Sequence, residues 1–195
     1  LNMGLAGIPW WTTDIGGFFG GHVEDENFRE LLIRWFEYGA FCPVMRLHGY
    51  RMPYQPQYGT TGGAACVSGA PNEIWSFGDQ VYDICRTYLD IRENLRPYTR
   101  ELMKEAHEKG TPVMRPLFYD FPEDKKCWEV ETQYMYGKDI LVAPVLYAKE
   151  NQMEVYLPEG EKWMNIWNGN IYEGGQTVVV DTPMDQIPIF TREGF

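Results

Sequence analysis

The sequence has few positive charges, few histidines and no long apolar run. Its 195 residues carry 17 Lys and Arg against 28 Asp and Glu, a formal net charge of −11, with only three His. Nucleic acids and anionic membrane surfaces bind basic patches, and the longest basic run here is Lys125-Lys126. No uncharged apolar run approaches the ~18 residues of a membrane-spanning helix. We therefore expect no nucleic-acid partner and no membrane partner.

Cysteine is sparse as well, and its four positions are scattered along the chain: Cys42, Cys66, Cys85 and Cys127. They form no C-x2-C pair and have no nearby His, so the spacing predicts no metal site, and nothing else in the sequence indicates a cofactor. Scattered cysteines are more typical of buried thiols than of a disulfide framework. This favours a reducing compartment, and no targeting segment is recognisable, so we expect a cytoplasmic location.

Two short apolar runs flank an amphipathic helix in the first part of the chain. Residues 8–13 form a β-branched and aromatic run that ends on Asp14 and enters a glycine-rich stretch, which predicts a buried strand followed by a loop. Residues 43–47 form a second run, which ends on His48 and Gly49. This alternation of strand, helix and strand is typical of a parallel sheet or barrel.

The helix between these runs is predicted from Asp25, a good N-cap, to Gly39, a C-terminal stop. Its apolar residues recur at helical spacing: Phe28, Leu31, Leu32, Trp35 and Phe36. Residues 50–74 are rich in glycine and proline and predict a long irregular loop. Ser76 resembles the start of a capping box, and Pro97 should kink or restart the helix that follows, which ends at Gly110.

From about residue 111 the helical period gives way to short β-type runs, and Asn168-Gly169 predicts a hairpin turn. We therefore expect two parts, residues 1–110 and an all-β module at residues 111–195.

Two polar residues end successive predicted strands, and such residues meet at one face of a barrel. Asp14 and His48 are therefore candidate site residues. The alternatives are that Asp14 is a structural carboxylate held by Arg46 or by loop amides, and that His48 is a hydrogen-bonded core histidine. The glycines at residues 16–21 do not form a G-x-G-x-x-G motif, so a phosphate cradle is not indicated.

Aromatic residues are frequent near these two positions: Trp10, Trp11, Phe18, Phe19, Tyr50, Tyr54 and Tyr58. They fit either core packing or a platform on which the C–H faces of sugars stack.

Two longer strings carry a family resemblance. GIPWWTTDIGGF at residues 7–18 and RWFEYGAFCPVMRLHG at residues 34–49 resemble the last part of the catalytic barrel of glycoside hydrolase family 31. Residues 96–98, 110–117, 136–145 and 155–160 resemble the barrel exit and the proximal β-domain of that family.

The resemblance implies the last two βα units of a (β/α)8 TIM barrel, followed by a small antiparallel β-sandwich. It also implies a retaining enzyme that uses one Asp nucleophile and one Asp acid/base. Both positions precede the segment that matches Leu1, so we expect no catalytic residue in this chain and no activity from it alone. The expected partners are an oligosaccharide substrate and the rest of the barrel.

By the same resemblance, His48 hydrogen-bonds sugar hydroxyls, Phe18 forms a pocket wall, Asp14 supports the pocket, and Arg46 orients Asp14 or His48. Trp11 is assigned to substrate binding with them. The motifs look most like α-xylosidases. An α-glucosidase, or a non-catalytic carbohydrate-binding or assembly module, is the alternative.

Overall fold

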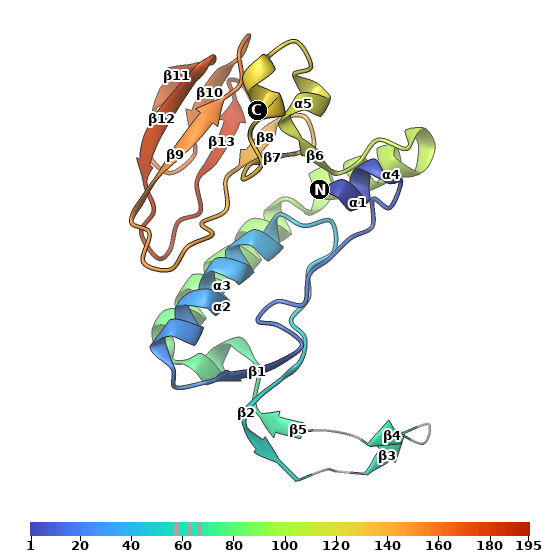
Figure 1. The fold of residues 1–195 in the computed structure, drawn as a ribbon, viewed down its shortest axis with the longest axis vertical. Helices are drawn as coiled ribbons and strands as arrows, with labels where there is room; N and C mark the ends of the chain where they lie inside the picture. Colours follow the sequence, from blue (N-terminus) through green and yellow to red (C-terminus); the bar gives the residue numbers. More distant parts are fainter. Residues whose placement is uncertain (57–58, 62–63, 66–67) are drawn as a thin grey trace.

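In the computed structural model, residues 1–56, 59–61, 64–65 and 68–195 are described, and they place a helical layer between a β-sheet region and a projecting arm (Figure 1). The helices are α1 (Asn2–Leu5), α2 (Glu26–Ala40), α3 (Asp79–Asn94), α4 (Arg96–Lys109) and α5 (Leu117–Asp120), with 3-10 turns at Ile74–Phe77 and Lys125–Trp128. The strands are β1 (Phe19–His22), β2 (Tyr50–Gln55), β3 (Thr60–Thr61), β4 (Ala64–Ala65), β5 (Ser68–Ala70), β6 (Met114–Pro116), β7 (Tyr134–Tyr136), β8 (Ile140–Val142), β9 (Gln152–Leu157), β10 (Lys162–Asn165), β11 (Ile171–Glu173), β12 (Gln176–Asp181) and β13 (Ile189–Arg192).

Helix α2 confirms the prediction from its apolar spacing. The Asp25 side chain accepts a hydrogen bond from the Asn27 amide at 3.0 Å and caps the first turn. Gly39 is not the stop, because the helix continues to Ala40. A Cβ on Gly39 would come within 2.5 Å of the Ile15 side chain, so this glycine lets the helix lie close to the segment that carries Asp14.

Neither of the two predicted parallel strands, at residues 8–13 and 43–47, forms as a strand. Residues 8–14 form no strand, and only an isolated parallel bridge joins Ile15 to Leu47. Ile8 and Trp10 are exposed, so the prediction of a buried strand at residues 8–13 is wrong. A strand needs hydrogen-bonded neighbours. Here one side of the segment meets residues 44–47, and the described chain supplies no strand on the other side.

Parallel pairing resumes beyond this bridge, where β1 lies beside β2 with Phe19 opposite Tyr50. The order of parallel strand, helix and parallel strand is that of the βαβ unit from which parallel sheets and barrels are built.

Residues 50–74 are not an irregular loop. β2 pairs antiparallel with β5, and β3 pairs with β4, so these four strands form an arm that extends from the helical layer (Figure 1). The prediction of an irregular loop is wrong, because the glycine and proline content of residues 50–74 indicated turns and gave no sign of this strand pairing. The predictions for Tyr58 and Cys66 lie outside the described residues.

The second helical stretch matches the sequence in part. Ser76 makes no capping box, because it lies in a 3-10 turn and α3 begins at Asp79. Pro97 falls in the first turn of α4, where a missing N–H does no harm, and so restarts the helix as predicted. Gly110 ends α4 in the left-handed conformation with φ of 73°. None of the helices in the described ranges is long and apolar enough to cross a membrane.

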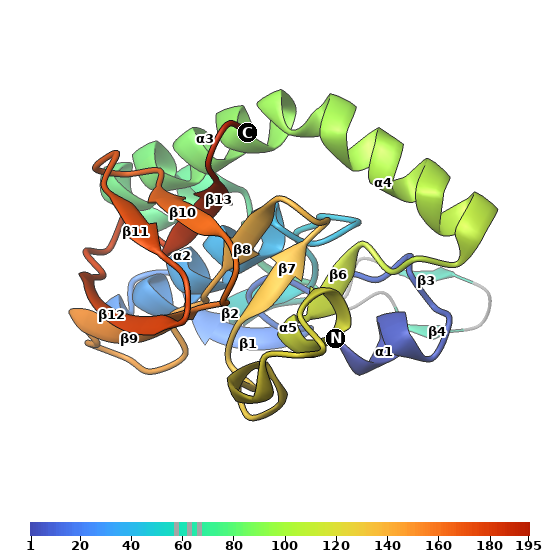
Figure 2. The same cartoon turned by 90° about the horizontal axis from the view of Figure 1, so that it is seen from above.

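Residues beyond Gly110 form the predicted β-rich region. Its main sheet has the order β11-β10-β13-β8-β7-β6, with β9 and β12 paired over one face (Figure 2). The Asn168-Gly169 turn joins β10 to β11, as predicted. That face buries Leu141, Trp163 and Phe190 against β9 and β12.

The other face of this sheet belongs to the same hydrophobic cluster as the helices. Tyr134, Tyr136 and Val142 lie in one cluster with Phe36 of α2 and Tyr88 of α3. Figure 2 shows α3 and α4 on this side and β9 and β12 on the opposite side. The division of the chain at residue 110 stays a prediction.

Candidate functional site

Asp14 and Arg46 form an ion pair at the point where the two short parallel segments meet. The bridge between Ile15 and Leu47 sets the preceding residues side by side. Arg46 donates from Nη2 and Nε to Oδ1 of Asp14, at 2.7 and 3.2 Å. Their side chains are 31% and 50% exposed, so the pair adds little stability but fixes the direction of the carboxylate. The contact agrees with the predicted role of Arg46 and equally with a structural Asp14.

Phe18 and His48 lie ring against ring. Their centroids are 4.8 Å apart and the rings are tilted by 52°. Phe18 is 58% exposed, and His48 is half-buried. His48 is therefore partly exposed to solvent and in contact with the Phe18 ring.

A buried arginine that the sequence reasoning missed holds the two loops of the site together. The Arg51 guanidinium is fully buried and donates to the carbonyl oxygens of His48 at 2.8 Å, Gly17 at 3.0 Å and Gly20 at 3.0 Å. Burial lowers the pKa of Arg51, and its contacts are carbonyl oxygens instead of a carboxylate. Arg51 thus binds the backbone on both sides of Phe18 and the backbone of His48.

Asn72 completes this clamp. Its amide oxygen accepts from Arg51 Nε at 2.8 Å, and its amide nitrogen donates to the carbonyls of His48 at 3.1 Å and Gly49 at 3.2 Å. Neither residue carries a sequence signal for this role, because hydrogen bonds to backbone carbonyls follow no residue pattern.

Two glycines allow the loops to approach this closely. Gly49 has φ of 91°, and a Cβ there would lie 2.1 Å from the carbonyl oxygen of Phe18. A Cβ on Gly16 would lie 2.7 Å from Arg51 Nη2. The glycines that follow Asp14 and His48 in the sequence are therefore the signal that could have indicated backbone contact.

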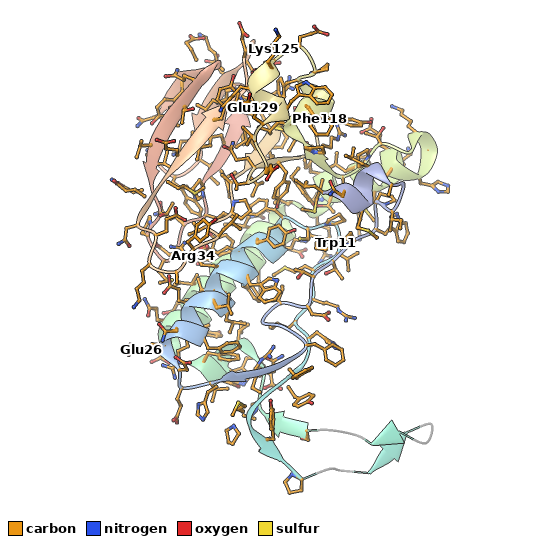
Figure 3. The ribbon with its side chains drawn as sticks, viewed as in Figure 1. Trp11, Glu26, Arg34, Phe118, Lys125 and Glu129 are labelled. Atoms are coloured by element: carbon orange, nitrogen blue, oxygen red, sulfur yellow. The ribbon has the colours of Figure 1, made fainter. Side chains whose placement is uncertain are left out.

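Trp11 lies elsewhere. It is partly buried against the helical cluster and lines a small cavity with Pro43, Val113 and Met114. Figure 3 shows it near the C-terminal end of α2, whereas Glu26 marks the opposite end. The structure does not bring Trp11 to the Phe18–His48 pair, so its assignment to substrate binding rests on the resemblance alone.

These residues offer an oriented carboxylate, a partly exposed histidine and an exposed aromatic ring. Such groups suit a neutral, hydroxyl-rich ligand, because hydroxyls hydrogen-bond to the polar groups while apolar C–H faces pack on the ring. Within the described ranges, no three His, Cys, Asp or Glu side chains are arranged to hold a metal ion.

Comparison with family models defines the class of protein. Residues 1–102 match the TIM-barrel domain of glycosyl hydrolases family 31, and residues 110–195 match the C-terminal domain of the same family. The chain belongs to glycosyl hydrolase family 31.

Individual relatives are α-xylosidases and α-glucosidases. Along the whole of this chain, it is 36% identical to an α-xylosidase of Saccharolobus solfataricus and 32% identical to α-glucosidase 2 of Bacillus thermoamyloliquefaciens. Among solved structures, a family 31 α-xylosidase from a soil metagenome, complexed with xylose, superposes on the whole chain with 54% identity and a TM-score of 0.95. The dextranase of Flavobacterium johnsoniae, complexed with glucose, does so with 34% identity and a TM-score of 0.83. The chain spans only 24% and 22% of the two curated relatives and 29% and 22% of the two solved chains.

Proposed function

We propose that the chain forms the last part of the catalytic barrel and the adjoining β-domain of a retaining glycoside hydrolase that releases α-linked xylose from oligosaccharides. The observation that carries this proposal is the 54% identity to an α-xylosidase solved with xylose, over the whole of this chain. The Phe18–His48 pair and the oriented carboxylate of Asp14 supply groups that suit one sugar ring.

In this proposal the chain contributes binding rather than the reacting carboxylates. Retention needs two carboxyl groups about 5–5.5 Å apart across the scissile bond. We assign both to the part of the barrel that precedes the segment matching Leu1. His48 would hydrogen-bond sugar hydroxyls, Phe18 would stack on the ring, and Asp14 would support them with Arg46.

An α-glucosidase is the second candidate, favoured by the 32% identity to α-glucosidase 2 and by the dextranase solved with glucose. A non-catalytic sugar-binding module is the third, and it would bind oligosaccharides without cleaving them.

We also propose a cytoplasmic location, on the ground that Cys42, Cys85 and Cys127 are buried free thiols.

The test uses the full-length protein that contains this chain, with p-nitrophenyl α-xyloside and α-glucoside compared side by side. We expect faster hydrolysis of the xyloside, and no hydrolysis by residues 1–195 alone. A higher kcat/KM for the glucoside selects the second candidate, and oligosaccharide binding without hydrolysis selects the third.

The variant that tests the site is His48→Ala. An unmade hydrogen bond in a desolvated pocket costs about 1–3 kcal/mol, so kcat/KM should fall about 5- to 150-fold while the melting temperature stays nearly constant. His107→Ala, which removes an exposed imidazole on α4, is the control. A large fall in melting temperature with normal turnover per folded molecule would contradict the assignment.

A further inference from the structure

The exposed face of β1 and β2 carries a row of aromatic rings that continues from the Phe18–His48 pair. Along β2, side chains alternate between the two faces of the sheet. Arg51 points into the protein, whereas Met52 and Tyr54 are 41% and 55% exposed. In register beside them, Phe19 of β1 lies opposite Tyr50 and is 64% exposed.

These rings form a continuous path, which we call the aromatic row: Phe18, Phe19, Tyr50 and Tyr54. Ring centroids are 6.1 Å apart from Phe18 to Phe19, 6.3 Å from Phe19 to Tyr50, and 5.6 Å from Tyr50 to Tyr54. The Phe19 and Tyr50 rings are nearly parallel, at 23°. Each ring is thus in contact range of the next, and His48 stands at one end of the row.

The backbone under the row is held firmly. Arg51 binds the carbonyls of Gly17, Gly20 and His48 from the inner face of the same sheet. The Tyr54 side chain reaches β1: its hydroxyl oxygen lies 4.0 Å from the position that a Cβ on Gly20 would occupy. The row is therefore a preformed surface, and binding to it would cost little ordering of the protein.

We propose that the aromatic row binds the sugar units of the oligosaccharide that lie beyond the one held by Phe18 and His48. This inference rests on the proposed function and extends the binding site to the rest of the substrate. Stacking suits uncharged sugar rings, and the two tyrosines add hydroxyl groups for hydrogen bonds while no side chain of the row is charged.

A protein partner fits the row less well. The exposed parts of four rings supply roughly 400 Å² of apolar surface. A stable protein interface buries about 800 Å² on each partner. The exposed area of the row therefore suits a short oligosaccharide better than a protein partner. The row also continues directly from the pair proposed to bind the first sugar.

The test uses the full-length protein and the variants Phe19→Ala and Tyr54→Ala, with Tyr147→Ala as the control. Tyr147 is exposed to 72% and lies in the loop after β8. Two substrates are compared: p-nitrophenyl α-xyloside, and an oligosaccharide with one terminal α-linked xylose and at least three further sugar rings. Melting temperatures confirm that every variant is folded.

For each row variant we expect KM for the oligosaccharide to rise about 3- to 10-fold, with kcat nearly unchanged and both constants for the aryl xyloside within about twofold of wild type. The control should match wild type on both substrates. Equal losses on both substrates, or no loss on the oligosaccharide, would overturn the inference. So would a change of oligomeric state in the row variants, which would make the row an interface between copies.

Calorimetric binding of the oligosaccharide separates this inference from the proposed function. Binding without hydrolysis would refute the proposed function, and weaker binding by Phe19→Ala would still support the row. A wild-type protein that binds no oligosaccharide would overturn the row as well.

Discussion

Glutamine in place of Glu37 should make the protein more stable at neutral and alkaline pH. Glu37 lies on the buried side of α2 with 1% exposure, and its Oε2 accepts from Arg34 Nη1 at 3.1 Å. Its other oxygen, Oε1, has no hydrogen-bond partner. Arg34, labelled in Figure 3, also donates to the carbonyls of Thr182 at 2.7 Å and Pro183 at 3.0 Å. The arginine therefore has acceptors that do not depend on the Glu37 charge.

The size of the effect follows from the pKa of Glu37. Burial raises this pKa from 4.5 to about 7, against the opposing attraction of Arg34. The folded state then binds a proton more tightly than the unfolded state. The free energy of unfolding contributed by this group is largest below pH 4.5, falls as the pH rises from 4.5 to 7, and is constant above 7. The fall amounts to about 3 kcal/mol, at 1.36 kcal/mol for each unit of pKa.

Urea unfolding at several pH values between 4.5 and 8 measures this difference. Glutamine keeps an oxygen for Arg34 and is uncharged at every pH. The free energy of unfolding of Glu37→Gln relative to wild type should therefore rise by about 3 kcal/mol from pH 4.5 to pH 8. Glu101→Gln, at an exposed position of α4, should show no such trend.

A difference between Glu37→Gln and wild type that stays flat with pH would refute this reasoning. A variant that is less stable than wild type at pH 8 would refute it more strongly, since the ionised pair would then stabilise the fold beyond its cost of desolvation.

Two further predictions concern the loops of the site, and urea unfolding measures both. Gly49→Ala should lower the free energy of unfolding by about 3 kcal/mol or more, because its Cβ meets the Phe18 carbonyl. Gly160→Ala, at a similar φ in open space, should lower it by only about 1 kcal/mol, and equal losses would refute the contact. Arg51→Met should lower the free energy of unfolding by about 3–5 kcal/mol, because it leaves buried carbonyls without donors. Arg46→Met should lower it by less than about 1 kcal/mol, and a similarly small loss for Arg51→Met would contradict the role of Arg51 in holding the two loops.

Local periodicity and capping were enough to predict α2, because Asp25 and the buried apolar stripe act within the helix itself. The run at residues 8–13 has equally clear β character but forms no strand, since a strand depends on hydrogen-bonded neighbours and the described residues supply them on one side only. The arm was missed for a related reason: pairing between β2 and β5 outweighs the turn-forming character of the glycine and proline between them.

The site divides in the same way. Asp14 and His48 were proposed as site residues from their places at the ends of apolar runs, and the bridge at Ile15 and Leu47 brings these segments together. Arg51 was not found, because a buried guanidinium among carbonyls is defined by a three-dimensional arrangement of backbone, and only the glycines around it leave a trace in the sequence.

The shared cluster between the sheet and the helices limits how family members can be recombined. Tyr134 donates to the carbonyl of Phe41 at 3.0 Å, and Arg92 donates to the hydroxyl of Tyr136 at 3.0 Å, so polar contacts cross the junction along with apolar ones. A chimera joined at residue 110 would have to bring matching residues from both parents. Substitutions on α2 or α3 and on β7 are therefore expected to be inherited in compatible sets, even though these elements match two different domain models of the family.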